Sequence, residues 1–144
     1  MARTSSRSTN SPNTILVADD DEDMLALVSS FLRTDGYRVM EARDGQDLLD
    51  QLQRTIDNPA IRPDVVVADI MMPRLTGIGV LDALRRAQVH VPVVLMTVLA
   101  DPSINLVARR LGAVGVLRKP FDASDLRAAV VGACLAYSST SRRA

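Results

Sequence analysis

Acidic, hydroxyl and amino side chains follow four apolar runs of this sequence, at the point where each run ends. Asp19 and Asp20 follow TILVA, Asp69 follows DVVVA, Thr97 follows PVVLM, and Lys119 comes one residue after VGVL. Carboxylates only a few ångströms apart destabilise each other unless a cation joins them. Hard oxygen ligands with no His or Cys beside them favour Mg²⁺ over zinc. If the ends of these runs meet in space, the sequence therefore predicts a Mg²⁺ site with a hydroxyl and an ammonium group next to it.

Such a set of side chains can accept a phosphoryl group. The metal ion and the Lys119 ammonium would neutralise the phosphoryl oxygens, the Thr97 hydroxyl would hydrogen-bond one of them, and a carboxylate would attack the phosphorus in line. Asp69 is the candidate nucleophile because it is expected at the centre of this arrangement. Lys119 is also the one lysine beside 16 arginines among the 17 basic residues. A compact ammonium suits a single phosphoryl oxygen better than a forked guanidinium does.

The elements that must position these residues follow from an alternation of short apolar runs and amphipathic segments. Three runs are continuously apolar, which is typical of strands covered on both faces of a parallel sheet. The segments between the runs repeat apolar residues at helical spacing, as helices with one buried face do. The predicted strands are Thr14–Ala18, Tyr37–Glu41, Asp64–Ala68, Pro92–Met96 and Val114–Leu117. The predicted helices are Glu22–Asp35, Gln46–Ile56, Ile78–Ala87, Pro102–Leu111 and Asp122–Tyr137.

Five strand–helix units predict an α/β fold: a (βα)5, doubly wound, parallel five-stranded sheet with the flavodoxin-like strand order 2-1-3-4-5. Chemistry in such a sheet is expected at the carboxyl ends of the strands. The first, third, fourth and fifth strands are neighbours in this order, so their ends converge. The second strand ends in Glu41-Ala42, farther out, and is expected to contribute nothing to the site.

One domain, residues 14–137, is expected between two polar tails. Residues 1–13 and 138–144 lack apolar periodicity, so we expect both to be disordered. Without the four arginines of these tails, 13 basic residues face 17 acidic ones, a net charge of −4 that argues against a nucleic-acid surface on the folded part. No apolar run approaches the length of a membrane span, so no membrane contact is expected. The single cysteine is consistent with a cytoplasmic protein.

The order and spacing of four pieces resemble those of the response-regulator receiver domains of two-component signalling. The pieces are ILVADDDEDML, DVVVADIMMPRLTG, VPVVLMT and ARRLGAVGVLRKPFD, and the resemblance covers residues 13–137. It implies that Asp69 is the phosphoacceptor. It also implies that Asp19 and Asp20 hold Mg²⁺, Asp20 directly and Asp19 through water. The backbone carbonyl of Met71 is implied as a further metal ligand.

The resemblance also implies partners and a switching mechanism. A histidine kinase or a phosphotransfer protein would donate the phosphoryl group from a phosphohistidine. Thr97 and Lys119 would then reposition, and the face of the fourth helix, fifth strand and fifth helix would change its affinity for a protein target. We expect the same face to be available for a phosphorylation-dependent homodimer. No DNA-binding output segment is expected in this chain, and the Lys119-Pro120 peptide is expected to be cis.

Some positions depart from the family pattern. Val116 stands where the family usually has Tyr or Phe, so the usual coupling of that aromatic ring to the Thr must be absent or replaced. Val98 stands where Ala or Gly is more usual, and its branched side chain would narrow access to the phosphoacceptor. Met71 and Leu99 are apolar and cannot position an attacking water, so we expect a slowly hydrolysing aspartyl phosphate.

Two other interpretations remain open at this point. Asp19-x-Asp21 resembles the nucleophile motif of haloacid-dehalogenase-type phosphatases, although that interpretation leaves DIMMP unexplained. A pseudo-receiver that binds partners without phosphorylation is suggested by Val98 and Val116. The rest of the acidic run, Asp21 to Asp23, is expected at the rim of the site and in the first helical turn, where the helix dipole favours negative charge.

Overall fold

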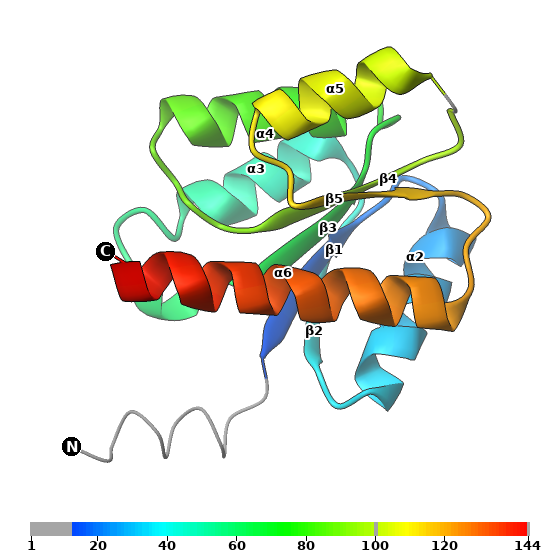
Figure 1. Ribbon diagram of the computed structural model, residues 1–144, viewed down its shortest axis with the longest axis horizontal. Coiled ribbons are helices and arrows are strands. Elements are labelled where there is room, and N and C mark those ends of the chain that lie inside the picture. The colour runs from blue at the N-terminus through cyan, green and yellow to red at the C-terminus, as the bar shows by residue number, and fades with distance from the viewer. Residues whose placement is uncertain (1–12, 100, 144) are drawn as a thin grey trace.

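The computed structural model describes residues 13–99 and 101–143. Its five strands form one parallel sheet in the order β2-β1-β3-β4-β5, which confirms the predicted fold (Figure 1). The strands are β1 (Thr14–Ala18), β2 (Arg38–Ala42), β3 (Val65–Asp69), β4 (Val93–Thr97) and β5 (Gly115–Arg118). All residues of β3 and β4 are buried, as their continuous apolar character predicted.

Each strand after the first begins and ends one residue later than its apolar run suggested. Asp69 and Thr97 are therefore the last residues of β3 and β4 and do not follow these strands. The reason is that backbone pairing, not side-chain polarity, ends a strand: the N–H of Ile70 still donates to the carbonyl of Met96, and the N–H of Lys119 to that of Thr97. The two polar side chains are thus held by the rigid sheet.

The helices cover the two faces of the sheet. They are α2 (Glu22–Thr34), α3 (Gly45–Gln53), α4 (Gly77–Arg86), α5 (Pro102–Arg110) and α6 (Ala123–Arg143), with a short 3₁₀ helix η1 (Pro59–Ile61) before β3. The buried residues of α3, α4 and α5 pack on one face, and those of α2 and α6 on the other (Figure 1). Alternate residues of the central strands point into the two aliphatic layers, as the period of two in a strand requires.

Two helix details correct the sequence analysis. Helical spacing predicts that Leu27, Ile56 and Val107 lie on buried helix faces, but all three are about half exposed. The second predicted helix ends at Gln53, three residues early. There the hydroxyl of Thr55 donates to the carbonyl of Leu52 at 2.6 Å, and this local bond competes with a further helical turn.

The ends of the chain were expected to be disordered. Residues 1–12 of the N-terminal tail lie outside the described residues. At the other end, α6 continues through Arg143, so residues 138–143 are helical. Extending an existing helix costs much less free energy than nucleating a new one, which explains how the packed part of α6 can carry this extension. No helix among the described residues is long and apolar enough to cross a membrane.

Candidate functional site

Three predicted site residues meet at the carboxyl ends of β1, β3 and β5. The Lys119 ammonium donates to Asp19 Oδ2 at 2.9 Å and to Asp69 Oδ2 at 3.0 Å. Asp19 and Asp69 are 1% and 7% exposed, and the side chain of Lys119 is 11% exposed. Because all five strands run parallel, their carboxyl ends lie at one edge of the sheet. Side chains 50 and 100 positions apart in the chain meet there, although β5 is paired with neither β3 nor β1. The Lys119-Pro120 peptide that follows is cis, as predicted.

The second oxygen of each buried carboxylate is held by its own loop. Asp19 Oδ1 accepts the N–H of Asp21 at 3.0 Å, and Asp69 Oδ1 accepts the N–H of Met71 at 3.1 Å. Asp20 is exposed beside them, and one carboxylate oxygen from each of Asp19, Asp20 and Asp69 lies within 4.8 Å of the others. This all-oxygen set is what Mg²⁺ prefers, so the residues fit the predicted metal.

Burial and charge oppose each other at this site. Burial raises the pKa of Asp69, the hydrogen bond from Lys119 lowers it, and the negative charge of Asp19 raises it again, so that the pKa is above its usual value. Burial alone would lower the pKa of Lys119, but its bonds to Asp19 and Asp69 outweigh burial and raise it. The ammonium therefore stays charged, and two carboxylates with one ammonium leave one negative charge for a cation to neutralise.

Thr97 lies beside this trio but is turned to its own loop. Its side chain is buried, and its Oγ1 accepts the N–H of Leu99 at 3.0 Å. Among the described residues, no hydrogen bond joins this hydroxyl to Asp69 or Lys119. The structure therefore places Thr97 at the right strand end without bringing it into the hydrogen-bonded cluster.

The acidic run after β1 divides into two parts. Asp21 is the N-cap of α2, and its Oδ1 accepts the N–H groups of Asp23 and Met24 at 3.0 and 3.3 Å. Glu22 pairs with Arg43 at 2.7 Å. Asp19 and Asp20 thus belong to the site, whereas the next three acids begin a helix, where the macrodipole stabilises them.

The loop after β2 braces the loop after Asp69, a role that the sequence analysis did not foresee. Asp44 caps α3 and forms an ion pair with Arg74, whose φ is 69°. A Cβ on Gly45 would overlap the carbonyl oxygen of Leu75, so only glycine lets the two loops come this close. The loop that follows β2 therefore supports the site, contrary to the expectation that the end of β2 contributes nothing. This loop supplies none of the clustered carboxylates. In the sequence, the pair Asp44-Gly45 after this strand is the signal that could have indicated a close contact between loops.

Gly77 serves a similar purpose at the start of α4. A Cβ there would lie 2.5 Å from the carbonyl oxygen of Asp69, which is too close for any side chain. Because Gly77 is the first residue of α4, the helix can start directly against the end of β3. The absence of a side chain at this position therefore fixes how near the helix lies to the candidate nucleophile.

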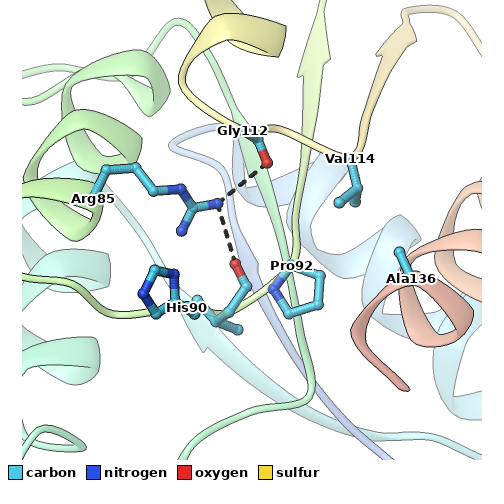
Figure 2. A pocket seen from close by; sticks show the side chains of 7 residues that line it. Arg85, His90, Pro92, Gly112, Val114 and Ala136 are labelled. Atoms are coloured by element: carbon cyan, nitrogen blue, oxygen red, sulfur yellow. Dashed lines mark hydrogen bonds between the residues drawn. The ribbon is translucent and has the colours of Figure 1, made fainter. Parts of the chain in front are cut away.

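A hollow lies at the amino ends of the strands, away from the acidic cluster. It has a volume of about 240 Å³ and is lined by Arg85, His90, Val114 and Ala136, among others (Figure 2). Arg85 crosses it to donate to the carbonyls of Val89, Leu111, Gly112 and Val91 at 2.9, 2.9, 3.2 and 3.5 Å. Its lining residues include no carboxylate, and burial lowers the pKa of Arg85. This hollow is built around a structural arginine and is separate from the candidate site.

Comparison with known proteins agrees with this geometry. Residues 15–131 match the family model described as the response regulator receiver domain. The chain is 35% identical over 116 residues to a probable transcriptional regulator, ycf27, of Porphyridium aerugineum, and 34% identical over 118 residues to the transcriptional regulatory protein CpxR of Escherichia coli K12. These alignments cover 81% and 82% of this chain but 45% and 47% of the relatives, so the chain spans about half their length.

Solved structures give the same picture. A response regulator receiver domain protein from Clostridium thermocellum superimposes with a TM-score of 0.76 at 30% identity, covering 88% of this chain and 97% of that one. The chemotaxis protein CheY4 of Vibrio cholerae superimposes with a TM-score of 0.75 at 28% identity, covering 85% of this chain and 99% of that one.

Proposed function

Because the chain belongs to the response-regulator receiver family, we propose that it is a phosphorylation-operated switch with Asp69 as its phosphoacceptor. The observation that carries this proposal is the buried Lys119 ammonium held between Asp19 and Asp69, with the carboxylate of Asp20 at the open side. Asp20 and Asp69 would hold Mg²⁺ together with the carbonyl of Met71, and Asp19 would act through water. The metal would supply positive charge to the phosphoryl oxygens.

The residues of this chain would act in three ways during transfer. A carboxylate oxygen of Asp69 would attack the phosphorus of a phosphohistidine, forming the O–P bond as the N–P bond breaks. Lys119 would move its bond from Asp69 to a phosphoryl oxygen and keep Asp19 as its anchor. Thr97 would give up the N–H of Leu99 to donate its own hydroxyl hydrogen to the phosphoryl group, which would release the loop that leads to α5.

The donor would be a histidine kinase or a phosphotransfer protein of two-component signalling in the cytoplasm. We propose that output leaves through the face of α5, β5 and α6, either to a protein target or to a second copy of the chain. Several large apolar side chains are exposed on these elements and the loop between them, which supports an interaction there: Leu106, Val107, Val114, Val131 and Leu135. Val116 of β5 is partly buried against the layer of α3, α4 and α5. We propose that this aliphatic side chain does not take over the coupling to Thr97 that an aromatic ring usually provides in the family.

Phosphorylation by a small donor tests the central proposal. The wild-type chain, incubated with acetyl phosphate and Mg²⁺, should gain one phosphoryl group by intact mass, and Asp69→Asn should gain none. Asp21→Asn is the matched control, because the side chain of Asp21 holds only the helix start, and this variant should still be phosphorylated. An unmodified wild-type chain would favour the pseudo-receiver.

The same preparation tests the phosphatase alternative. That enzyme would turn over p-nitrophenyl phosphate and lose this activity in Asp19→Asn. The structure gives it little support, because Asp21, the second acid of the motif, is bound to the backbone of α2. We propose that the protein catalyses no more than its own phosphorylation and dephosphorylation.

The aspartyl phosphate is proposed to be long-lived. Met71 and Leu99, which flank the site, present no group that could orient a water molecule, and their side chains are partly exposed. Phosphate release from the purified phosphoprotein with Mg²⁺ should therefore be slow and should accelerate in Met71→Asn, whose amide can hold a water. Rapid release from the wild-type chain would contradict this proposal.

A further inference from the structure

A groove of about 620 Å³ lies along the start of β2, away from the carboxyl ends that hold Asp69. Three arginines from three elements line it: Arg33 at the end of α2, Arg38 at the start of β2, and Arg62 after η1. None of the residues that line the groove is acidic. The groove is therefore a concentration of positive charge on a folded part whose net charge is negative.

The three guanidinium groups are only loosely engaged. Arg38 is exposed and forms no ion pair with any described residue. The closest approach of Arg33 to Glu41 is 3.8 Å, with both side chains substantially exposed. Arg62 donates to the hydroxyl and carbonyl oxygens of Thr55, at 3.4 and 3.3 Å, which are neutral groups. The groove thus offers charged donors that an anionic partner could engage.

The backbone of β2 adds a second feature. β2 is an edge strand, paired only with β1. The N–H of Arg38 donates inward to the carbonyl of Asn13, so strand alternation turns the N–H and carbonyl of Val39 outward. Farther along, Gln51 covers the outward carbonyl of Glu41 at 2.9 Å. No described residue covers Val39 in this way, and it lines the groove.

We propose that this edge binds an extended acidic segment of a partner protein as a sixth strand beside β2. Backbone pairing at Val39 would align the segment, as in other strand additions to open sheet edges. Carboxylates of the segment would meet Arg38 and Arg62, and Ile61, which is 51% exposed, would supply apolar contact.

The tails of this chain do not suit the groove. Residues 1–12 contain two arginines and no acid, and residues 138–144 likewise contain two arginines and no acid. Like charge would keep both tails away from three arginines. We therefore assign the groove to a segment of another protein and not to either tail. Because the groove is remote from Asp69, this contact goes beyond the proposed switch and would not require phosphorylation.

Fluorescence anisotropy with the full chain tests the charge requirement. The probe is a fluorescein-labelled peptide of about eight alternating Glu and Val residues, long enough to span a typical strand. It should bind the wild-type chain, phosphorylated or not, and a Lys-Val peptide should not. Arg38→Glu should weaken binding at least about tenfold, as expected when an attractive contact becomes repulsive. The matched control Arg110→Glu, at an exposed position of α5, should leave it unchanged. Lack of binding by the wild-type chain overturns the proposal.

A second variant separates strand addition from simple anion binding. Val39→Pro removes one outward N–H and leaves all three arginines, and proline is tolerated at strand edges. It should weaken peptide binding as Arg38→Glu does. If Val39→Pro binds like the wild-type chain, or if ATP displaces the peptide at similar concentration, the groove takes small anions and the proposal fails. Should this variant not fold, hydrogen exchange of the Val39 amide in the wild-type chain decides: protection on adding peptide supports the proposal, and no protection contradicts it.

Discussion

Each end of the sheet holds a partly buried cationic side chain that donates hydrogen bonds to several oxygens, but the chemical type of these oxygens differs between the two ends. At the carboxyl ends, Lys119 lies between the carboxylates of Asp19 and Asp69. At the amino ends, Arg85 donates to four backbone carbonyls, among them that of Gly112 (Figure 2). The acceptors of Lys119 carry full negative charges, whereas the acceptors of Arg85 are neutral carbonyl dipoles.

This difference separates a site that can change from one that cannot. In the proposed transfer, Lys119 exchanges a carboxylate for a phosphoryl oxygen, because both are anions that compete for the same ammonium. No described residue gives Arg85 an anionic partner to exchange, and its planar fork matches several fixed carbonyls at once. It ties the connection between α4 and β4 to the connection between α5 and β5. Under the proposed function, the carboxyl ends serve chemistry, while the amino ends serve stability.

The largest effect is expected from Lys119→Arg. A forked guanidinium cannot replace the point-like ammonium between the two carboxylates, so the rate of phosphorylation by acetyl phosphate should fall about 100-fold, as for the loss of one preorganised donor. The rate is followed by intact mass. Arg85→Lys is the control in the same assay and should react at the wild-type rate. Equal losses in both variants would erase the proposed distinction.

Arg85→Lys should instead affect stability. An ammonium cannot reach all four carbonyls, so the free energy of unfolding in urea should fall by about 2 kcal/mol, the value of one or two charged hydrogen bonds. The neighbouring Arg86, an exposed residue paired with Asp82, supplies the control Arg86→Lys, which should change stability by less than about 0.5 kcal/mol. If the free energy of unfolding of Arg85→Lys equals that of the wild-type chain, the bonds from Arg85 to the four carbonyls do not stabilise the fold.

Mg²⁺ should act at one end only. At several times its dissociation constant, the ion should raise the free energy of unfolding by about 1 kcal/mol through linkage to the folded state. Asp20→Asn should lose most of this gain, whereas Arg85→Lys should keep it in full. Thermal unfolding with Mg²⁺ and then with excess EDTA measures the effect, and a gain that survives in Asp20→Asn would place the metal elsewhere.

The smallest effect concerns a polar group that belongs to neither end. The hydroxyl of Ser29 on α2 is buried and has no hydrogen-bond partner among the described residues. Ser29→Ala should therefore raise the free energy of unfolding by up to about 1 kcal/mol, because it removes an unsatisfied group. Thr97→Ala provides the contrast, since its buried oxygen is bonded to Leu99 and its loss should destabilise the fold. Destabilisation by Ser29→Ala in urea unfolding would show an unrecognised partner.

Most of the fold and the reactive cluster could be predicted because their signals are local. Continuous apolar runs marked β1, β3 and β4, and the carboxyl-end rule for parallel sheets brought Asp19, Asp69 and Lys119 together before any contact was known. Lys119 stood out as a candidate site residue because it is the only lysine in a sequence with 16 arginines. The boundaries moved by one residue because strand ends depend on backbone pairing with neighbours that the sequence does not display.

The sequence by itself determined the strand order expected for this pattern and the chemical type of each residue at the strand ends. Tertiary structure alone decided that Gly45 must be small, that Arg85 is structural, and that Arg33, Arg38 and Arg62 share one groove. The physical reason is the nature of the partners. Arg85 binds backbone carbonyls, which every residue possesses. Gly45 must be small because the backbone of Leu75 lies against it. The same loop supplies Arg74, which pairs with Asp44 from 30 positions away in the chain. Only folding makes such partners specific.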